Sequence, residues 1–104
     1  MSDKGATPLK FVWDPNKEST NKRKHGITFL EACYVFADKF MLTLYDDEHS
    51  GEEDRWVTIG QTPNNLLVVV HTFKEITGTE YVRIISARKA NNNEVKQYLD
   101  RRGK

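Results

Sequence analysis

The sequence is poor in cysteine and has no long apolar run, and each absence excludes a class of protein. Its one cysteine, Cys33, has no second cysteine to pair with, which excludes a disulfide scaffold and a zinc ribbon. No apolar stretch approaches the roughly 18 residues that a membrane-spanning helix needs, and residues 1–8 lack the apolar segment of a signal peptide. We therefore expect a cytoplasmic protein with no membrane partner.

A strong charge of one sign is also missing. The 104 residues carry 16 Lys and Arg against 15 Asp and Glu, and this net charge of +1 argues against general binding to DNA. The charge is unevenly distributed, because residues 22–24 are basic, residues 46–54 are mostly acidic, and the C-terminus is basic again. The length suits one core, so we expect a flexible tail over residues 1–9 and a single domain over residues 10–104.

The first part of the chain predicts a short strand and an unusual helix. Residues 10–13 alternate enough to form a strand. Asp14 and Pro15 then provide an N-cap and a first helical residue, and Gly26 ends the helix by adopting a left-handed conformation. Because residues 16–25 contain no apolar side chain, this helix must lie on the surface or cover something polar.

A second helix and a series of strands follow. Thr28 and Glu31 have the spacing of a capping box, and apolar residues then recur at helical spacing as core. The later pattern predicts strands at residues 40–45, 55–61, 66–73 and 81–87 and a helix over residues 91–102. Short connections, with turn residues at 62–65 and 77–78, favour an antiparallel meander. We predict an α+β fold with the two N-terminal helices on one face of the sheet, a C-terminal helix, and the other face open.

The most informative stretch is residues 83–90, with the sequence RIISARKA. An apolar strand there delivers three cations, Arg83, Arg88 and Lys89, and the hydroxyl of Ser86 to one end of the sheet. Simple alternation puts Ser86 on the side of the strand opposite Arg83. Clustered guanidinium groups suit a multiply charged oxyanion, of which phosphate is the commonest. The stretch therefore predicts a phosphate or nucleic-acid site.

Several motifs resemble those of the BrnT toxins of bacterial type II toxin–antitoxin modules. They are, in chain order, WDPxK from Trp13, NxxKHGIxFxxA from Asn21, HS at His49 leading to ExR at Glu53, TIG from Thr58, and RIISARKA from Arg83. Together they are specific, and the resemblance covers residues 11–98. It implies a RelE-like fold and a ribonuclease that inhibits translation and growth.

The same resemblance implies the partners. A cognate BrnA-like antitoxin with a DNA-binding domain would neutralise the toxin, and the complex would repress its own operon. Operator DNA would then be bound only through the antitoxin. The final helix and the open face of the sheet are the docking surfaces that we expect for this partner.

The chemistry of RNA cleavage selects candidate catalytic residues. Cleavage without a metal ion needs a group to deprotonate the ribose 2′-OH, charge to stabilise the phosphorane, and a proton for the leaving 5′ oxygen. Arg55, Arg83 and Arg88 can supply the charge. Glu53 could act as the base or could equally hold an arginine in place, and the imidazole of His25 could act as acid or base. We expect no cofactor.

The polar first helix predicts contacts with the RNA backbone. Lys17, Asn21 and Lys24 are four and three residues apart, which places them on one face of that helix. With Lys89, these residues are predicted to bind RNA phosphates. A solvated helix face would look the same, so the family resemblance decides between the two interpretations.

The acidic residues 46–54 leave three interpretations open. They can form a solvated loop, or pair with the protein's own arginines or with a basic segment of a partner. They can also hold a divalent ion with His49, which would make a metal-dependent nuclease, although the spacing matches no EF-hand or zinc signature.

A different class of function is a non-catalytic module whose arginines only bind phosphate or a partner. His71 lies in an apolar strand and is predicted to be buried, outside the site.

Overall fold

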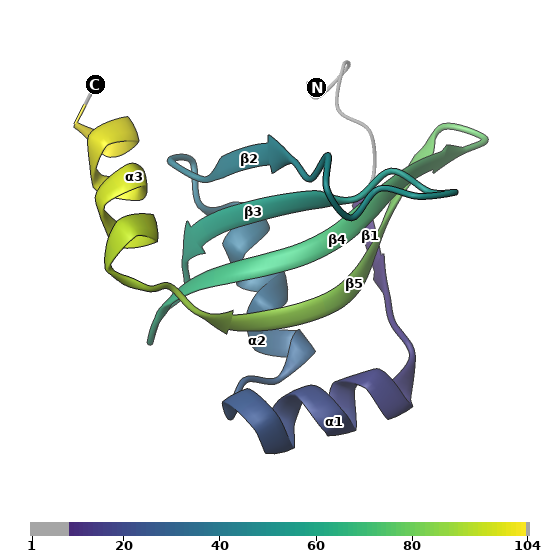
Figure 1. Cartoon of the computed structure of the whole chain (residues 1–104). Helices are drawn as coiled ribbons and strands as arrows, with labels where there is room; N and C mark the ends of the chain where they lie inside the picture. Colours follow the sequence, from purple (N-terminus) through teal and green to yellow (C-terminus); the bar gives the residue numbers. More distant parts are fainter. Residues whose placement is uncertain (1–8, 104) are drawn as a thin grey trace.

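The computed structural model describes residues 9–103, which form a five-stranded mixed sheet with three α-helices and a short 3-10 helix (Figure 1). The elements in chain order are β1 (Leu9–Val12), α1 (Pro15–His25), α2 (Phe29–Cys33), η1 (Tyr34–Ala37), β2 (Leu42–Tyr45), β3 (Trp56–Gln61), β4 (Leu66–Ile76), β5 (Thr79–Lys89) and α3 (Asn92–Arg102). None of these helices is long and apolar enough to cross a membrane. The predicted tail lies outside the described residues up to residue 8, whereas Leu9 already belongs to β1.

The predicted meander is confirmed for β2 to β5, which pair as consecutive antiparallel strands. The predicted turn joins β4 to β5, and its residues Thr77 and Gly78 both have the positive φ of a tight hairpin. The strand predicted at residues 10–13 is present as β1, but its pairing was not predicted: it adds to β5 in parallel with Val12 opposite Arg83, so that the strand order is β1-β5-β4-β3-β2. Two α-helices and the 3-10 helix separate β1 from the other strands in the chain, so no hairpin dictates the direction of this pair.

A β-bulge in β5 shifts the alternation of its side chains. Val70 of β4 pairs with Ser86, and the next residue, His71, pairs with Ile84. Ile85 is therefore an extra residue on β5. The alternation of side chains between the two faces of the sheet shifts by one residue at this point.

The bulge corrects the predicted faces of β5. Ala87 is buried in the core on the helix-covered side, whereas Ser86 and Arg88 line a cavity on the other side. Arg83 lies between two buried neighbours and so also points away from the core. The expectation that Ser86 and Arg83 lie on opposite sides is wrong, because one inserted residue brings them to the same face.

The main core lies between one face of the sheet and the helices α2 and η1. Phe29 and Ala32 of α2 and Val35 of η1 are fully buried against strands β4 and β5. The 3-10 helix can approach β3 closely because Gly60 has no side chain, and a Cβ there would lie 2.7 Å from Cγ1 of Val35. This face of the sheet is therefore filled, and space for a ligand remains on the other face.

The start of α2 differs in part from its prediction. The Thr28 hydroxyl accepts a hydrogen bond from the Glu31 amide at 3.1 Å, as expected. The reciprocal half of the predicted capping box is not formed. The Glu31 carboxylate instead accepts hydrogen bonds from the Asn65 amide at 2.7 Å and the Thr62 hydroxyl at 3.2 Å. Both partners belong to the β3–β4 turn, so Glu31 ties α2 to the sheet.

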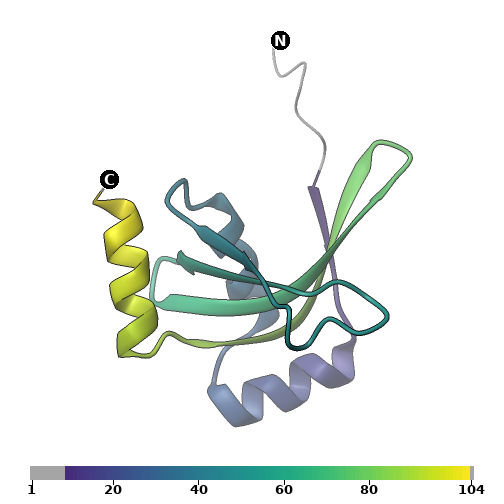
Figure 2. The ribbon, with the colours of Figure 1, turned by 45° about the horizontal axis from the view of Figure 1, so that its top comes forward.

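Helix α3 packs on the other face of the sheet, at one end. Tyr98 is buried beside Ile59 and Val68, and its hydroxyl donates a hydrogen bond to Asp38 at 2.6 Å. The loop over residues 46–55, between β2 and β3, lies at the opposite end of the strands from α3 (Figure 2). This face is therefore bordered at both ends, and the candidate site lies between the two borders.

His71 is buried, as predicted, but only one of its ring nitrogens has a partner. Its Nε2 lies 2.7 Å from the Thr58 hydroxyl, and the ring packs edge-on against Phe36 and Phe73. Within residues 9–103, Nδ1 has no hydrogen-bond partner. Burial lowers the pKa of His71 from 6.5 to about 4, because the charged ring would lose its hydration.

We expect His71 to make the fold sensitive to acid. Between pH 6.5 and about 4 the unfolded chain binds a proton that the folded protein does not, so stability present above pH 6.5 is lost as the pH falls. The shift corresponds to about 3 kcal/mol. Urea unfolding at pH 7 and pH 4.5 measures this loss, which a His71→Gln variant is expected largely to escape. Equal losses in both proteins would contradict the expectation.

Candidate active site

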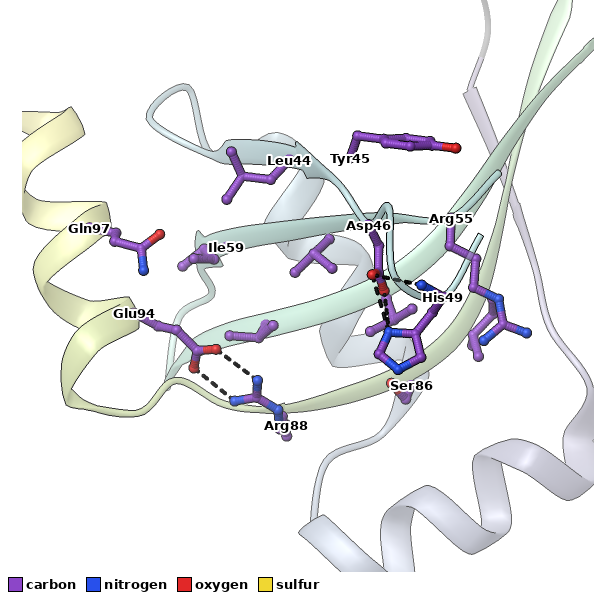
Figure 3. A pocket seen from close by; sticks show the side chains of 14 residues that line it. Leu44, Tyr45, Asp46, His49, Arg55, Ile59, Ser86, Arg88, Glu94 and Gln97 are labelled. Atoms are coloured by element: carbon purple, nitrogen blue, oxygen red, sulfur yellow. Dashed lines mark hydrogen bonds and ion pairs between the residues drawn. The ribbon is translucent and has the colours of Figure 1, made fainter. Parts of the chain in front are cut away.

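A cavity of about 510 Å³ lies on the open face of the sheet, between α3 and the loop over residues 46–55 (Figure 3). Aliphatic residues of the strands line it: Leu44, Val57, Ile59, Val68, Val70 and Ile85. Polar and charged side chains complete the lining, namely Tyr45, Asp46, His49, Arg55, Ser86, Arg88, Glu94 and Gln97. Cations beside an apolar surface suit a ligand that carries both an anionic group and a flat, weakly polar ring.

Arg88 enters this cavity from the end of β5 in a bidentate pair with Glu94 of α3. The two guanidinium nitrogens donate to the two carboxylate oxygens at 2.8 and 2.7 Å. Glu94 also accepts the backbone N–H of Asn91 at 2.8 Å and so completes a capping box at the start of α3. The hydrogen bonds from Arg88 hold the pKa of Glu94 below its usual value, and Glu94 raises the pKa of Arg88. The pair fixes the guanidinium at the edge of the cavity.

Arg55 lines the cavity at the end opposite Arg88, where it follows a braced loop. The Ser50 hydroxyl donates to the carbonyl oxygen of Asp46 at 2.6 Å and accepts the backbone N–H of Arg55 at 2.9 Å. The backbone N–H of Asp46 donates to the carbonyl oxygen of Arg55 at 2.9 Å. His49 lies within the same loop, and its Nδ1 is 3.1 Å from both carboxylate oxygens of Asp46. The bracing holds Asp46, His49 and Arg55 as one unit.

Arg83 lies on the same face of β5 but does not line this cavity. Its guanidinium forms an ion pair with Glu53 of the loop, and both side chains are largely exposed. Two of the three predicted arginines, Arg55 and Arg88, therefore share a cavity, and the third is paired beside it.

A second cavity, of about 330 Å³, lies between α1 and β5. Its lining includes Lys17, Lys24 and His25 of α1, together with Ile85 and Ser86 of the bulge. Since Ile85 and Ser86 line both cavities, the two hollows meet at the bulge. The structure thus separates His25 from Arg55 and Arg88 but places it next to two predicted RNA-binding lysines.

Comparison with known families shows to which family the chain belongs. The profile described as "Ribonuclease toxin, BrnT, of type II toxin-antitoxin system" matches residues 13–94 of the 104-residue chain. The chain belongs to the BrnT family. This confirms the resemblance inferred from the motifs, and the family is one of ribonuclease toxins of type II toxin–antitoxin systems. A search of curated proteins finds no match. The matched segment of this BrnT chain includes every charged residue of both cavities.

Asn21 has a structural role that the sequence did not predict. It lines the second cavity with Lys17 and Lys24, but its side chain is buried and its amide group is used within the protein. It donates to the carbonyl oxygens of Ile27 at 3.1 Å and Ala87 at 2.8 Å, and it accepts the Ala87 N–H at 3.1 Å. In this BrnT chain Asn21 holds α1 against β5 in place of the missing apolar stripe.

Lys89, a predicted RNA-binding residue, lines neither cavity. It is exposed and lies on the other side of the strand from Arg88. Three of the six carboxylates of residues 46–54 are engaged within the protein: Glu53 binds Arg83, Asp46 binds His49, and Asp54 accepts a hydrogen bond from the Tyr45 hydroxyl. Among residues 9–103, no group of three or more His, Cys, Asp or Glu side chains is arranged to hold a metal ion. The ion pair of Glu53 and Arg83 fits the interpretation in which the carboxylates pair with the protein's own arginines.

The sequence interpretation missed the role of Glu94. A signal was present, because Asn91 and Glu94 have the spacing of a capping box at the predicted start of the last helix. Its second role, as the partner of Arg88, depends on the change of direction between β5 and α3. This corner brings the two side chains together although they are six residues apart in the chain. No local sequence pattern predicts such a corner.

Proposed function

We propose that this BrnT chain is an endoribonuclease toxin that cleaves RNA without a metal ion and thereby inhibits translation and growth. The observation that best supports the proposal is the shared cavity of Arg55 and Arg88 in a member of a ribonuclease toxin family. Arg88, in β5, and Arg55, just before β3, line one cavity of about 510 Å³ with an aliphatic surface. Such a site can hold a phosphate at its rim and a base against its floor.

In this proposal Arg55 and Arg88 bind the non-bridging oxygens of the scissile phosphate. Guanidinium groups stay protonated at any working pH, and they supply positive charge where negative charge grows on the phosphorane. Arg88 is already oriented by Glu94, so the group does not have to be ordered when substrate binds. The arginines thereby provide the charge stabilisation that a metal ion supplies in other nucleases.

The second cavity extends the RNA-binding surface. Lys17 and Lys24 of α1 bind phosphates that flank the scissile one, and His25 lies beside them. Because the bulge lines both cavities, an RNA strand can pass from one to the other across Ser86. Of the two roles left open for Glu53, we assign the positioning of Arg83, since the two form an ion pair.

The remaining parts of the proposal concern fold and partners. We propose that residues 9–103 act as one RelE-like toxin domain in the cytoplasm, where messenger RNA is translated. A BrnA-like antitoxin covers the open face and α3, and so blocks the cavity. Its DNA-binding domain, and not the toxin, contacts operator DNA, and the complex represses its own operon.

Cleavage of a purified RNA in the presence of EDTA tests the proposed activity. We expect the purified protein to shorten a pure transcript at the same rate with and without EDTA, since the charge stabilisation comes from arginines. Gel electrophoresis and mass spectrometry of the ends measure the products. Binding without cleavage would favour a non-catalytic module, and cleavage that EDTA abolishes would favour a metal site; either result would overturn the proposal.

A further inference from the structure

We propose that His49, oriented by Asp46, is the general base that removes the proton from the ribose 2′-OH. The inference rests on the proposed function, because it assigns the proton transfer in the cavity that holds Arg55 and Arg88. It adds a catalytic residue, His49, and a positioning residue, Asp46. Sequence reasoning considered His49 as part of a family motif and as a possible metal ligand, and Asp46 as part of an acidic loop.

The first support is the geometry of the pair. The Nδ1 atom of His49 is 3.1 Å from each carboxylate oxygen of Asp46, and the backbone N–H of His49 donates to Asp46 Oδ1 at 3.2 Å. The Asp46 side chain is 16% exposed, whereas the His49 side chain is 64% exposed. A carboxylate at Nδ1 favours the tautomer with its proton there, so the lone pair is on Nε2. The pair therefore presents a proton acceptor to the solvent side of the loop.

The second support is the position of the ring. His49 lines the cavity of Arg55 and Arg88, and Figure 3 shows the ring on the side of the loop that faces Ser86. The hydrogen bonds of Ser50 to Asp46 and Arg55 hold the loop in this arrangement. A phosphate bound by the arginines would thus place its neighbouring ribose within the cavity that the ring borders.

The other candidates for the base are located less favourably. Glu53 forms an ion pair with Arg83 and does not line the cavity of Arg55 and Arg88. His25 lines the second cavity, on the α1 side of the bulge. Among residues 9–103, His49 is the imidazole that shares a cavity with the two arginines.

The reaction can be written with all atoms in balance. Nε2 of His49 takes the proton of the 2′-OH as the 2′ oxygen forms a bond to phosphorus, and the bond from phosphorus to the 5′ oxygen breaks. The leaving 5′ oxygen takes a proton from water, and the resulting hydroxide is neutralised by the proton on His49. The products are a 2′,3′-cyclic phosphate and a free 5′-OH, and no oxidant or reductant is needed. Asp46 stabilises the imidazolium formed in the first step.

Single-turnover cleavage over pH 5 to 8 tests the inference. We expect His49→Ala and His49→Gln to cleave RNA at least about 100-fold more slowly than the natural protein, and to lose the rise in rate with pH that a titrating base produces. We expect Asp46→Asn to slow cleavage less, and Asp46→Glu to restore part of the rate, because a carboxylate can again orient the ring. The charged and titratable groups that line the same cavities as the ring are Tyr45, Asp46, Glu52, Glu53, Arg55, Arg88 and Glu94.

Two controls separate the possible failures. Lys96→Gln, an exposed residue of α3 that lines neither cavity, is the control for a surface substitution, and we expect it to keep the rate and the pH profile of the natural protein. Binding of an RNA with a 2′-deoxy nucleotide at the cleavage site should be unchanged in the His49 variants, since the arginines remain. Full-rate cleavage by both His49 variants, or an unchanged pH profile, would overturn the inference but leave the nuclease proposal standing. Absence of cleavage by the natural protein would overturn the nuclease proposal itself.

Discussion

Replacing Arg88 by alanine is expected to lower the rate of RNA cleavage about 100- to 1000-fold, the usual effect of removing one preorganised electrostatic donor. The reason is its position: the guanidinium is fixed by two hydrogen bonds to Glu94 at the edge of the cavity that Arg55 also lines. Arg55→Ala is expected to have an effect of similar size. Single-turnover kinetics on a synthetic RNA measure the loss in the chemical step, provided that enough of each variant is present to bind all of the RNA.

The loss must be separated from a loss of stability. Arg88→Ala leaves Glu94, a mostly buried carboxylate, without its partner, which raises the pKa of Glu94 and destabilises the fold at neutral pH. Arg88→Ala/Glu94→Gln removes that charge and keeps a capping side chain for α3, so we expect it to recover stability without recovering cleavage. Arg101→Ala, outside both cavities, is the matched arginine control. Recovery of cleavage in the double variant would show that Arg88 has only a structural role.

Expression of the natural chain in bacteria is expected to arrest growth, whereas Arg55→Ala/Arg88→Ala is expected to be tolerated at the same protein level. The physical reason is that cleavage of cellular RNA needs both charges on the scissile phosphate. Coexpression of the small reading frame next to the toxin gene is expected to restore growth, because an antitoxin bound over the open face blocks the cavity. Viable counts and immunoblots measure both effects.

Two outcomes of the growth experiment would count against the account. Unaffected growth at confirmed expression would contradict the assignment as a toxin. Arrest by the double arginine variant would show that toxicity has a source other than this cavity. Failure of the neighbouring reading frame to restore growth would leave the toxin in place but reject that frame as its antitoxin.

Local chemistry was sufficient to predict much of the fold. Asp14, Pro15 and Gly26 mark the ends of α1, and residues 77–78 mark the β4–β5 turn, because caps and tight turns depend on residues close together in the chain. The parallel pairing of β1 could not be predicted, because no short connection determines it. The bulge at Ile85 was equally invisible, since one extra residue leaves no mark in a strand whose two faces are both partly apolar.

The site was predictable by residue type more than by arrangement. Arginine is recognisable as a phosphate ligand, and Arg55 and Arg88 do meet at one cavity. Asn21 looked like a surface residue on a polar helix, yet the backbone of Ala87, 66 residues later, occupies its amide. Glu94 gains its importance from the corner between β5 and α3, and His49 gains its importance from a folded loop; sequence spacing describes neither.

The structure of the protein with a short RNA, deoxy at the 2′ position of the cleavage site, tests the central claim most directly. Without its 2′-OH the RNA cannot react, so the intact phosphate can be located. The account predicts that this phosphate lies between the guanidinium groups of Arg55 and Arg88, with flanking phosphates near Lys17 and Lys24. A scissile phosphate bound elsewhere, with the cavity of Arg55 and Arg88 empty, would contradict it.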